Sequence, residues 1–223
     1  MIHTDTLSFL KKLNKNNNRE WFEKNKAIYI TAKDNVEANV AEIIAGIRTF
    51  DKRIGDDIEA RKAMFRIYRD VRFSANKAPY KNNLGASINP GGRMAPTPGY
   101  YIHIQPDGGS FVAGGMWMPE APQLAKIRQE IDYNLDEFKA LLKDKNFKKF
   151  YAGLDNDEGY TLSRPPKGYT PDNPAVEFLK YKSFTLSHNF SDEEVMQKNF
   201  TKNAIAACKA MHPFLSFLQR AID

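Results

Sequence analysis

The positive charge of this sequence is concentrated in one short segment. Between Arg61 and Lys81 there are seven basic side chains and a single acid, Asp70, and this excess equals the net charge of +6 of the whole chain. A patch of this kind attracts phosphate, carboxylate or nucleic acid. The sequence leaves equally open that these cations pair with acids elsewhere in the fold.

Apolar and polar side chains alternate over residues 65–74, and this period of two predicts a β-strand. Arg66 and Arg72 then point to the same side, together with Tyr68 and Asp70. Two guanidinium groups on one face can each hold a phosphate or carboxylate oxygen pair in fork geometry. The strand is followed by a loop that adds two further candidate ligand contacts, Lys77 and Lys81.

A second alternating segment, residues 100–105, places His103 and Tyr101 on the same predicted face. His103 is a candidate general acid or base near neutral pH, and Asp70 is expected either to orient it or to hold the arginines. The alternative is that Asp70 only neutralises arginines on a solvated face.

The long connection over residues 89–99 carries Arg93 at its centre, where a cation would suit an anionic ligand. An ordinary Pro/Gly loop is the alternative. Arg69 falls among apolar neighbours in the predicted strand, so we expect a structural role for it, with a carboxylate or backbone carbonyls as partners.

Other chemistries have little support. The four histidines are scattered without metal-ligand spacing, so we expect no metal site and no cofactor. Cys208 is the single cysteine and lies on an apolar helical stripe, which predicts a core position. The glycines at 91 and 92 lack the spacing of a nucleotide-binding loop.

Around these residues the pattern predicts an α+β fold: an antiparallel sheet of about four to five strands flanked by helices. Besides 65–74, strands are expected at 84–89, 100–105, 110–117 and 182–190. A long N-terminal helix runs to about Phe50, and a C-terminal helix continues through Pro213 with a kink. No linker is evident, so we expect one domain over residues 1–223.

No apolar run approaches membrane-spanning length, and the N-terminus lacks the pattern of a signal peptide. A lone cysteine makes a reducing cytoplasm the simplest location. The sequence does not indicate an oligomeric state.

The same residues carry a family resemblance. The run from Phe65 to Ser74, with Lys77 and Pro79-Tyr80-Lys81 after it, resembles the signature of domain of unknown function 2461. Further matching segments are Asn17–Phe22, Gly99–Ile104, Gly114–Trp117 and Lys182–Phe184. The resemblance covers nearly the whole chain and implies a single-domain, mainly bacterial protein. It brings no assigned activity and no assigned catalytic residue.

Three hypotheses follow. The first is binding of, or catalysis on, a small phosphorylated or carboxylated ligand at the basic face. The second is a nucleic-acid-binding module that uses the same patch through phosphate contacts, which we rank lower because aromatic side chains near it are few. The third is a structural or interaction protein whose arginines serve folding alone.

Overall fold

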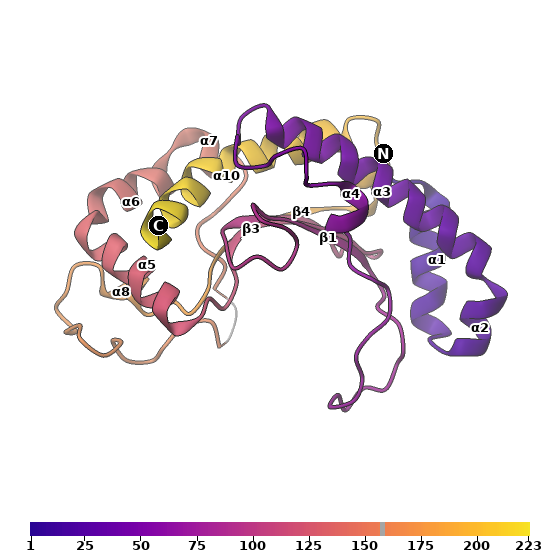
Figure 1. Ribbon diagram of the computed structural model, residues 1–223, viewed down its shortest axis with the longest axis horizontal. Helices are drawn as coiled ribbons and strands as arrows, with labels where there is room; N and C mark the ends of the chain where they lie inside the picture. The colour runs from indigo at the N-terminus through magenta and orange to yellow at the C-terminus, as the bar shows by residue number, and fades with distance from the viewer. Residues whose placement is uncertain (157–158) are drawn as a thin grey trace. The chain divides into compact units, whose positions relative to one another are not determined.

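The computed structural model describes residues 1–156 and 159–223 and confirms the α+β class. One four-stranded antiparallel sheet, in the order β1-β2-β3-β4, is accompanied by helices (Figure 1). The strands are β1 (Leu84–Ile88), β2 (Gly99–Ile104), β3 (Ser110–Met116) and β4 (Phe184–Phe190). They correspond to four of the five expected strands.

The fifth expected strand, over residues 65–74, does not form, and that prediction was wrong. Only isolated bridges remain, one just before the segment, Met64 with Ala86, and one inside it, Tyr68 with Tyr80. The Asp70 carboxylate accepts a hydrogen bond from the backbone N–H of Arg72 at 3.3 Å, a local turn that competes with a strand ladder. The segment is instead part of a long loop between α4 and β1 (Figure 1). The Phe73 side chain in this loop is 98% exposed.

The long N-terminal helix is present as α3 (Lys26–Arg48), but it does not extend back to residue 20. A separate short helix α2 (Arg19–Lys24) precedes it and is capped by Asn18, whose side chain accepts from the N–H of Trp21. At the break, the backbone N–H and the side chain of Asn25 both donate to the Trp21 carbonyl, at 3.1 and 2.8 Å. Before both lies α1 (Thr4–Lys15), and after them the single-turn α4 (Ala60–Ala63).

The alternation that predicted the sheet is visible in its burial. On β2 and β3, Ile102, Ile104 and Val112 are buried, while the intervening Tyr101 and His103 are half-buried. The β2–β3 turn uses Asp107 and Gly108, with φ of 62° and 74°, and the Asp192 carboxylate accepts from both of their N–H groups. One face of the sheet therefore belongs to the core, and the other holds the polar side chains discussed below.

The later helices are α5 (Ala121–Tyr133), α6 (Leu135–Lys143), α7 (Lys145–Lys148) and α8 (Val176–Leu179). Ser191 and Glu194 form a capping box, which opens the short α9 (Asp192–Met196). The last helix, α10 (Phe200–Ile222), runs without interruption through Pro213, and the kink expected there stays a prediction.

Two compact units emerge from the packing. The first comprises residues 1–95, 101–112 and 189–206, and the second comprises 96–100, 113–188 and 207–223. Because β2, β3 and β4 each contribute residues to both units, the expectation of one domain stays a prediction. No helix within the described ranges is long and apolar enough to cross a membrane.

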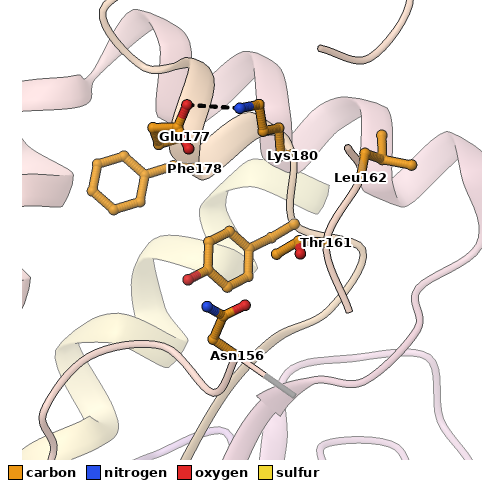
Figure 2. A pocket seen from close by; sticks show the side chains of 7 residues that line it. Asn156, Thr161, Leu162, Glu177, Phe178 and Lys180 are labelled. Carbon is orange, nitrogen blue, oxygen red and sulfur yellow. Dashed lines mark hydrogen bonds and ion pairs between the residues drawn. The ribbon is translucent and has the colours of Figure 1, made fainter. Parts of the chain in front are cut away.

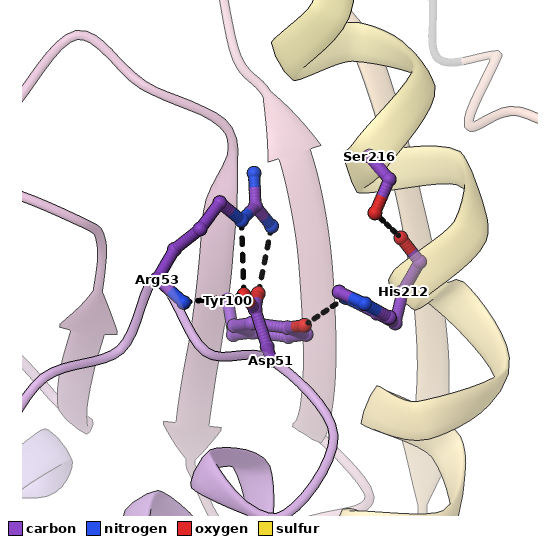
Figure 3. Close-up of polar contacts among 5 residues, drawn as sticks. All are labelled: Asp51, Arg53, Tyr100, His212 and Ser216. Atoms are coloured by element: carbon purple, nitrogen blue, oxygen red, sulfur yellow. Dashed lines mark hydrogen bonds and ion pairs between the residues drawn. The ribbon is translucent and has the colours of Figure 1, made fainter.

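Each unit contains a buried polar pair (Figure 3). In the first unit, the almost fully buried Asp51 carboxylate forms a two-pronged ion pair with Arg53, at 2.7 and 2.9 Å. In the second, the Tyr100 hydroxyl lies 3.2 Å from His212 Nδ1 (Figure 3). Both pairs satisfy polar groups that burial would otherwise penalise.

Candidate functional site

Two of the expected ligand contacts, Lys81 and Arg93, lie against one aromatic ring in the first unit, that of Phe65. The Lys81 ammonium lies 5.1 Å and the Arg93 guanidinium carbon 5.2 Å from the ring centroid. Arg66 is the next residue after Phe65, and its charge acts on Lys81. We call Arg66, Lys81 and Arg93 the cationic cluster.

Backbone hydrogen bonds fix the positions from which these side chains start. Phe65 N–H donates to the carbonyl of Gly85 on β1 at 2.9 Å, and Lys81 N–H donates to that of Ile67 at 2.8 Å. Arg93 comes from the β1–β2 connection, and its Nη1 donates to the carbonyl of Met64. The cluster is thus assembled from three segments that the edge of the sheet holds together.

The cluster lacks a carboxylate partner. Among the described residues, none of its three members forms an ion pair, whereas Lys62, for example, lies 2.6 Å from Glu59. Burial lowers the pKa of Lys81, and the charges of Arg66 and Arg93 lower the pKa further. Like charges that repel one another in this way create a positive potential that an anion would relieve.

Next to the cluster, β2 carries a hydrogen-bonded line of side chains. The Tyr101 hydroxyl lies 3.0 Å from His103 Nδ1, and His103 Nε2 lies 3.0 Å from Gln105 Oε1. The imidazole stacks on Phe111 with ring centroids 4.5 Å apart, and Tyr101 meets the edge of Phe65 at 6.3 Å. Tyr101 therefore links the histidine to the ring that supports the cations.

The surroundings of these side chains favour the uncharged forms of His103 and Tyr101. Burial lowers the pKa of His103, and the nearby Lys81 charge lowers it further, while the hydrogen bond to Gln105 opposes both. Burial also raises the pKa of Tyr101. Since Gln105 Oε1 can only accept, His103 carries its proton on Nε2, and Nδ1 accepts from the Tyr101 hydroxyl.

Gly85 on β1 makes room for this arrangement. A Cβ atom at Gly85 would lie 2.5 Å from the Tyr101 hydroxyl oxygen and 3.3 Å from the Ile102 carbonyl oxygen. An isolated glycine inside a strand pattern is a sequence signal for such close approach, and the sequence reasoning above did not use it. It also missed Gln105, Phe111 and the support that Phe65 gives to the cations.

The other expected site residues lie in the loop after Phe65 and make contacts with one another. Arg72 pairs with Asp70, at 2.7 and 3.0 Å, and both side chains are well exposed. Arg72 accordingly lowers the pKa of Asp70, with a smaller effect from Arg66. Within the described residues, Asp70 makes no hydrogen bond to His103.

Lys77 and Tyr68 are engaged within the same loop. Lys77 donates to the Val71 carbonyl at 3.1 Å, and Tyr68 packs against Tyr80 with centroids 5.3 Å apart. Arg69 donates to the Ala78 carbonyl at 3.1 Å, so a carbonyl partner of the expected kind is present, and its structural role stays a prediction. Arg69, Lys77 and Tyr68 therefore all contact other residues of this loop.

The second unit contains a shallow pocket of about 260 Å³ (Figure 2). Its two opposite charges, Lys180 and Glu177, already pair with each other at 2.7 Å. The other lining residues are Asn156, Thr161, Leu162, Phe178 and Tyr181. No group of histidine, cysteine and acidic side chains within the described residues is suited to hold a metal ion.

The α+β fold and the cationic cluster beside a hydrogen-bonded histidine do not by themselves identify a protein family, but a sequence comparison does. The family model described as conserved hypothetical protein (DUF2461) matches residues 5–217, and the chain belongs to this family. Comparison with curated proteins and with solved structures yields no match.

Proposed function

We propose that the protein binds a small phosphorylated or carboxylated ligand at the cationic cluster. The observation that carries the proposal is the convergence of Lys81 and Arg93 on one ring, with Arg66 adjacent and with no ion-paired acid among the described residues. Buried or half-buried cations that serve only the fold normally pair with carboxylates, because an unpaired charge costs free energy. A ligand anion would supply the missing partner.

His103 and Tyr101 supply proton-carrying groups beside the proposed ligand. Both ring nitrogens of His103 are engaged, so a ligand must replace Gln105 or Tyr101 before the imidazole can exchange a proton with it. Binding at the cluster and proton transfer by His103 are therefore separable, and we treat catalysis as the second of the two steps.

The first test is a thermal-shift screen of phosphorylated and carboxylated metabolites with wild-type protein and two variants. Arg66→Ala removes a member of the cluster, while Arg72→Ala removes a neighbouring cation that Asp70 already pairs. Charge-assisted hydrogen bonds contribute about 1.5–3 kcal/mol, so Arg66→Ala should weaken binding of any hit roughly tenfold or more. Equal losses in both variants would contradict a site at the cluster.

A nucleic-acid-binding function is the second candidate, and one observation favours it. Phe73 is 98% exposed, and the Arg72 guanidinium lies 5.9 Å from its ring centroid. Exposed aromatic rings with adjacent arginines stack on unpaired bases. Binding of single-stranded DNA or RNA that weakens steeply with salt and needs Phe73 would support this function over the first.

The proposed setting is the reducing cytoplasm. Cys208 is the single cysteine and is fully buried, and burial raises the pKa of its thiol to about 12. The chain can therefore form no internal disulfide.

A further inference from the structure

The Lys81 ammonium differs in its surroundings from the lysines of the chain that pair with an acceptor. Lysines such as Lys24 and Lys180 contact carboxylates, and Lys77 contacts backbone carbonyls. Within the described residues, Lys81 Nζ makes no hydrogen bond or ion pair and instead faces the Phe65 ring at 5.1 Å. Its nitrogen is consequently not engaged by an acceptor that would hold the protonated form.

The charged groups that act on Lys81 also disfavour that form. Arg66 and Arg93 are cations, and the neighbouring His103 is held in a neutral state. A lysine amine becomes a nucleophile when burial or a second cation removes its proton near neutral pH. The same two arginines are suited to hold a carboxylate beside the amine.

We propose that Lys81 forms an imine with an aldehyde or ketone that carries a carboxylate group, which Arg66 and Arg93 hold. This inference rests on the proposed function and names the substrate class for that site. The Lys81 nitrogen attacks the carbonyl carbon, and a C–N bond forms. The carbonyl oxygen takes both amine protons and leaves as water, so the step needs no further reactant.

Reductive trapping tests the proposal. Wild-type protein is incubated at pH 7 with glyoxylate and cyanoborohydride, and peptide mass spectrometry locates the resulting carboxymethyl groups. The internal reference is Lys24, an exposed lysine paired with Glu20. A lowered pKa leaves more free amine at pH 7, so Lys81 should be modified faster than Lys24.

Glycolaldehyde provides the matched probe, because it has similar size and an aldehyde but no carboxylate. The preference for Lys81 over Lys24 should be smaller with glycolaldehyde than with glyoxylate. Arg66→Ala should lower modification of Lys81 by glyoxylate about tenfold and have less effect with glycolaldehyde. Arg66 is exposed, so this substitution leaves the fold intact, which a thermal unfolding curve checks.

Glyoxylate modification of Lys81 no faster than that of Lys24 would overturn the proposal. An equal preference with both aldehydes would overturn the carboxylate-binding part of it. Inorganic phosphate distinguishes failure of the imine from failure of the anion site. If phosphate stabilises the wild type but not Arg66→Ala, and Lys81 is not selectively modified, the anion site stands and the imine fails. If neither occurs, the proposed function fails as well.

Discussion

Replacing Lys81 with methionine should stabilise the folded protein. The ammonium is half-buried and is repelled by Arg66 and Arg93, and no described carboxylate pairs with it. Methionine keeps much of the side-chain length and its contact with the Phe65 ring while removing the charge. A substitution that deletes a charged group and raises stability is unusual, because most substitutions destabilise a protein.

The size of the effect follows from the surroundings of the charge. Solvent reaches Lys81, so each like-charge repulsion is worth only a few tenths of a kcal/mol, comparable to an exposed ion pair of opposite sign. The loss of a cation–π contact with Phe65 is largely offset by the sulfur–aromatic contact that replaces it. Removing the charge relieves both the two repulsions and the desolvation of the ammonium. We therefore expect the free energy of unfolding to rise by about 0.5–1 kcal/mol at pH 7.

Urea unfolding monitored by tryptophan fluorescence measures this gain. Lys81→Arg keeps the charge and should show no stabilisation. Lys24→Met removes an exposed lysine that is paired with Glu20, and should be neutral or slightly destabilising. Because salt screens charges at the surface, the gain from Lys81→Met should shrink at about 0.5 M NaCl.

The Lys81→Met variant should also differ from the wild type in the pH dependence of its stability. The pKa of Lys81 is lowered in the folded protein, so between that value and the unfolded value near 10.4 the unfolded chain binds more protons. Stability should therefore rise with pH across this interval in the wild type and less so in Lys81→Met. A destabilising Lys81→Met, or a gain that salt leaves unchanged, would refute the reasoning.

Three further predictions concern neighbouring features. Because the pKa of His103 is lowered in the folded protein, its contribution to stability is complete above the unfolded value near 6.5 and is lost as pH falls toward the folded value. Urea unfolding should thus show a decline from pH 7 to pH 5 that is smaller in His103→Asn; an identical decline would contradict this. Gly85→Ala should cost about 1–3 kcal/mol, because its Cβ would displace the Tyr101 hydroxyl, whereas Gly153→Ala, with open space around it, should stay within about 0.5 kcal/mol in the same assay. Phe73→Ser should change the melting temperature little, since the ring is 98% exposed, and a large drop would mean that the ring is packed in solution.

The sheet was largely predictable because its strands show a period of two and are separated by strong turn residues. The same rule failed for residues 65–74, although the alternation there is as regular. Only Ile67 of that segment is buried, so the pattern was not produced by a core face. The Asp70 side chain and the Lys77 ammonium bind backbone groups of the loop, and a periodicity rule does not register such local competition.

Part of the candidate site was predictable as well, because it lies on a strand that shows the period of two. Tyr101 and His103 were placed together because they share a strand face, and the charge count selected the stretch of chain that contributes Arg66 and Lys81 to the cationic cluster. The partnership of Lys81 with Arg93 could not be read from spacing, because it depends on how two loops fold back over Phe65. The pairing of Arg72 with Asp70 followed from the loop that replaced the expected strand.

The most direct test of the cationic cluster is an NMR titration of the Lys81 side-chain nitrogen with and without inorganic phosphate. The account predicts a pKa below the ordinary lysine value, because burial and two guanidinium groups oppose the charged form. It also predicts that phosphate raises the pKa of Lys81, because a bound anion favours the ammonium. A Lys81 that titrates at the ordinary lysine value, or that does not respond to phosphate, would contradict an anion site at this position.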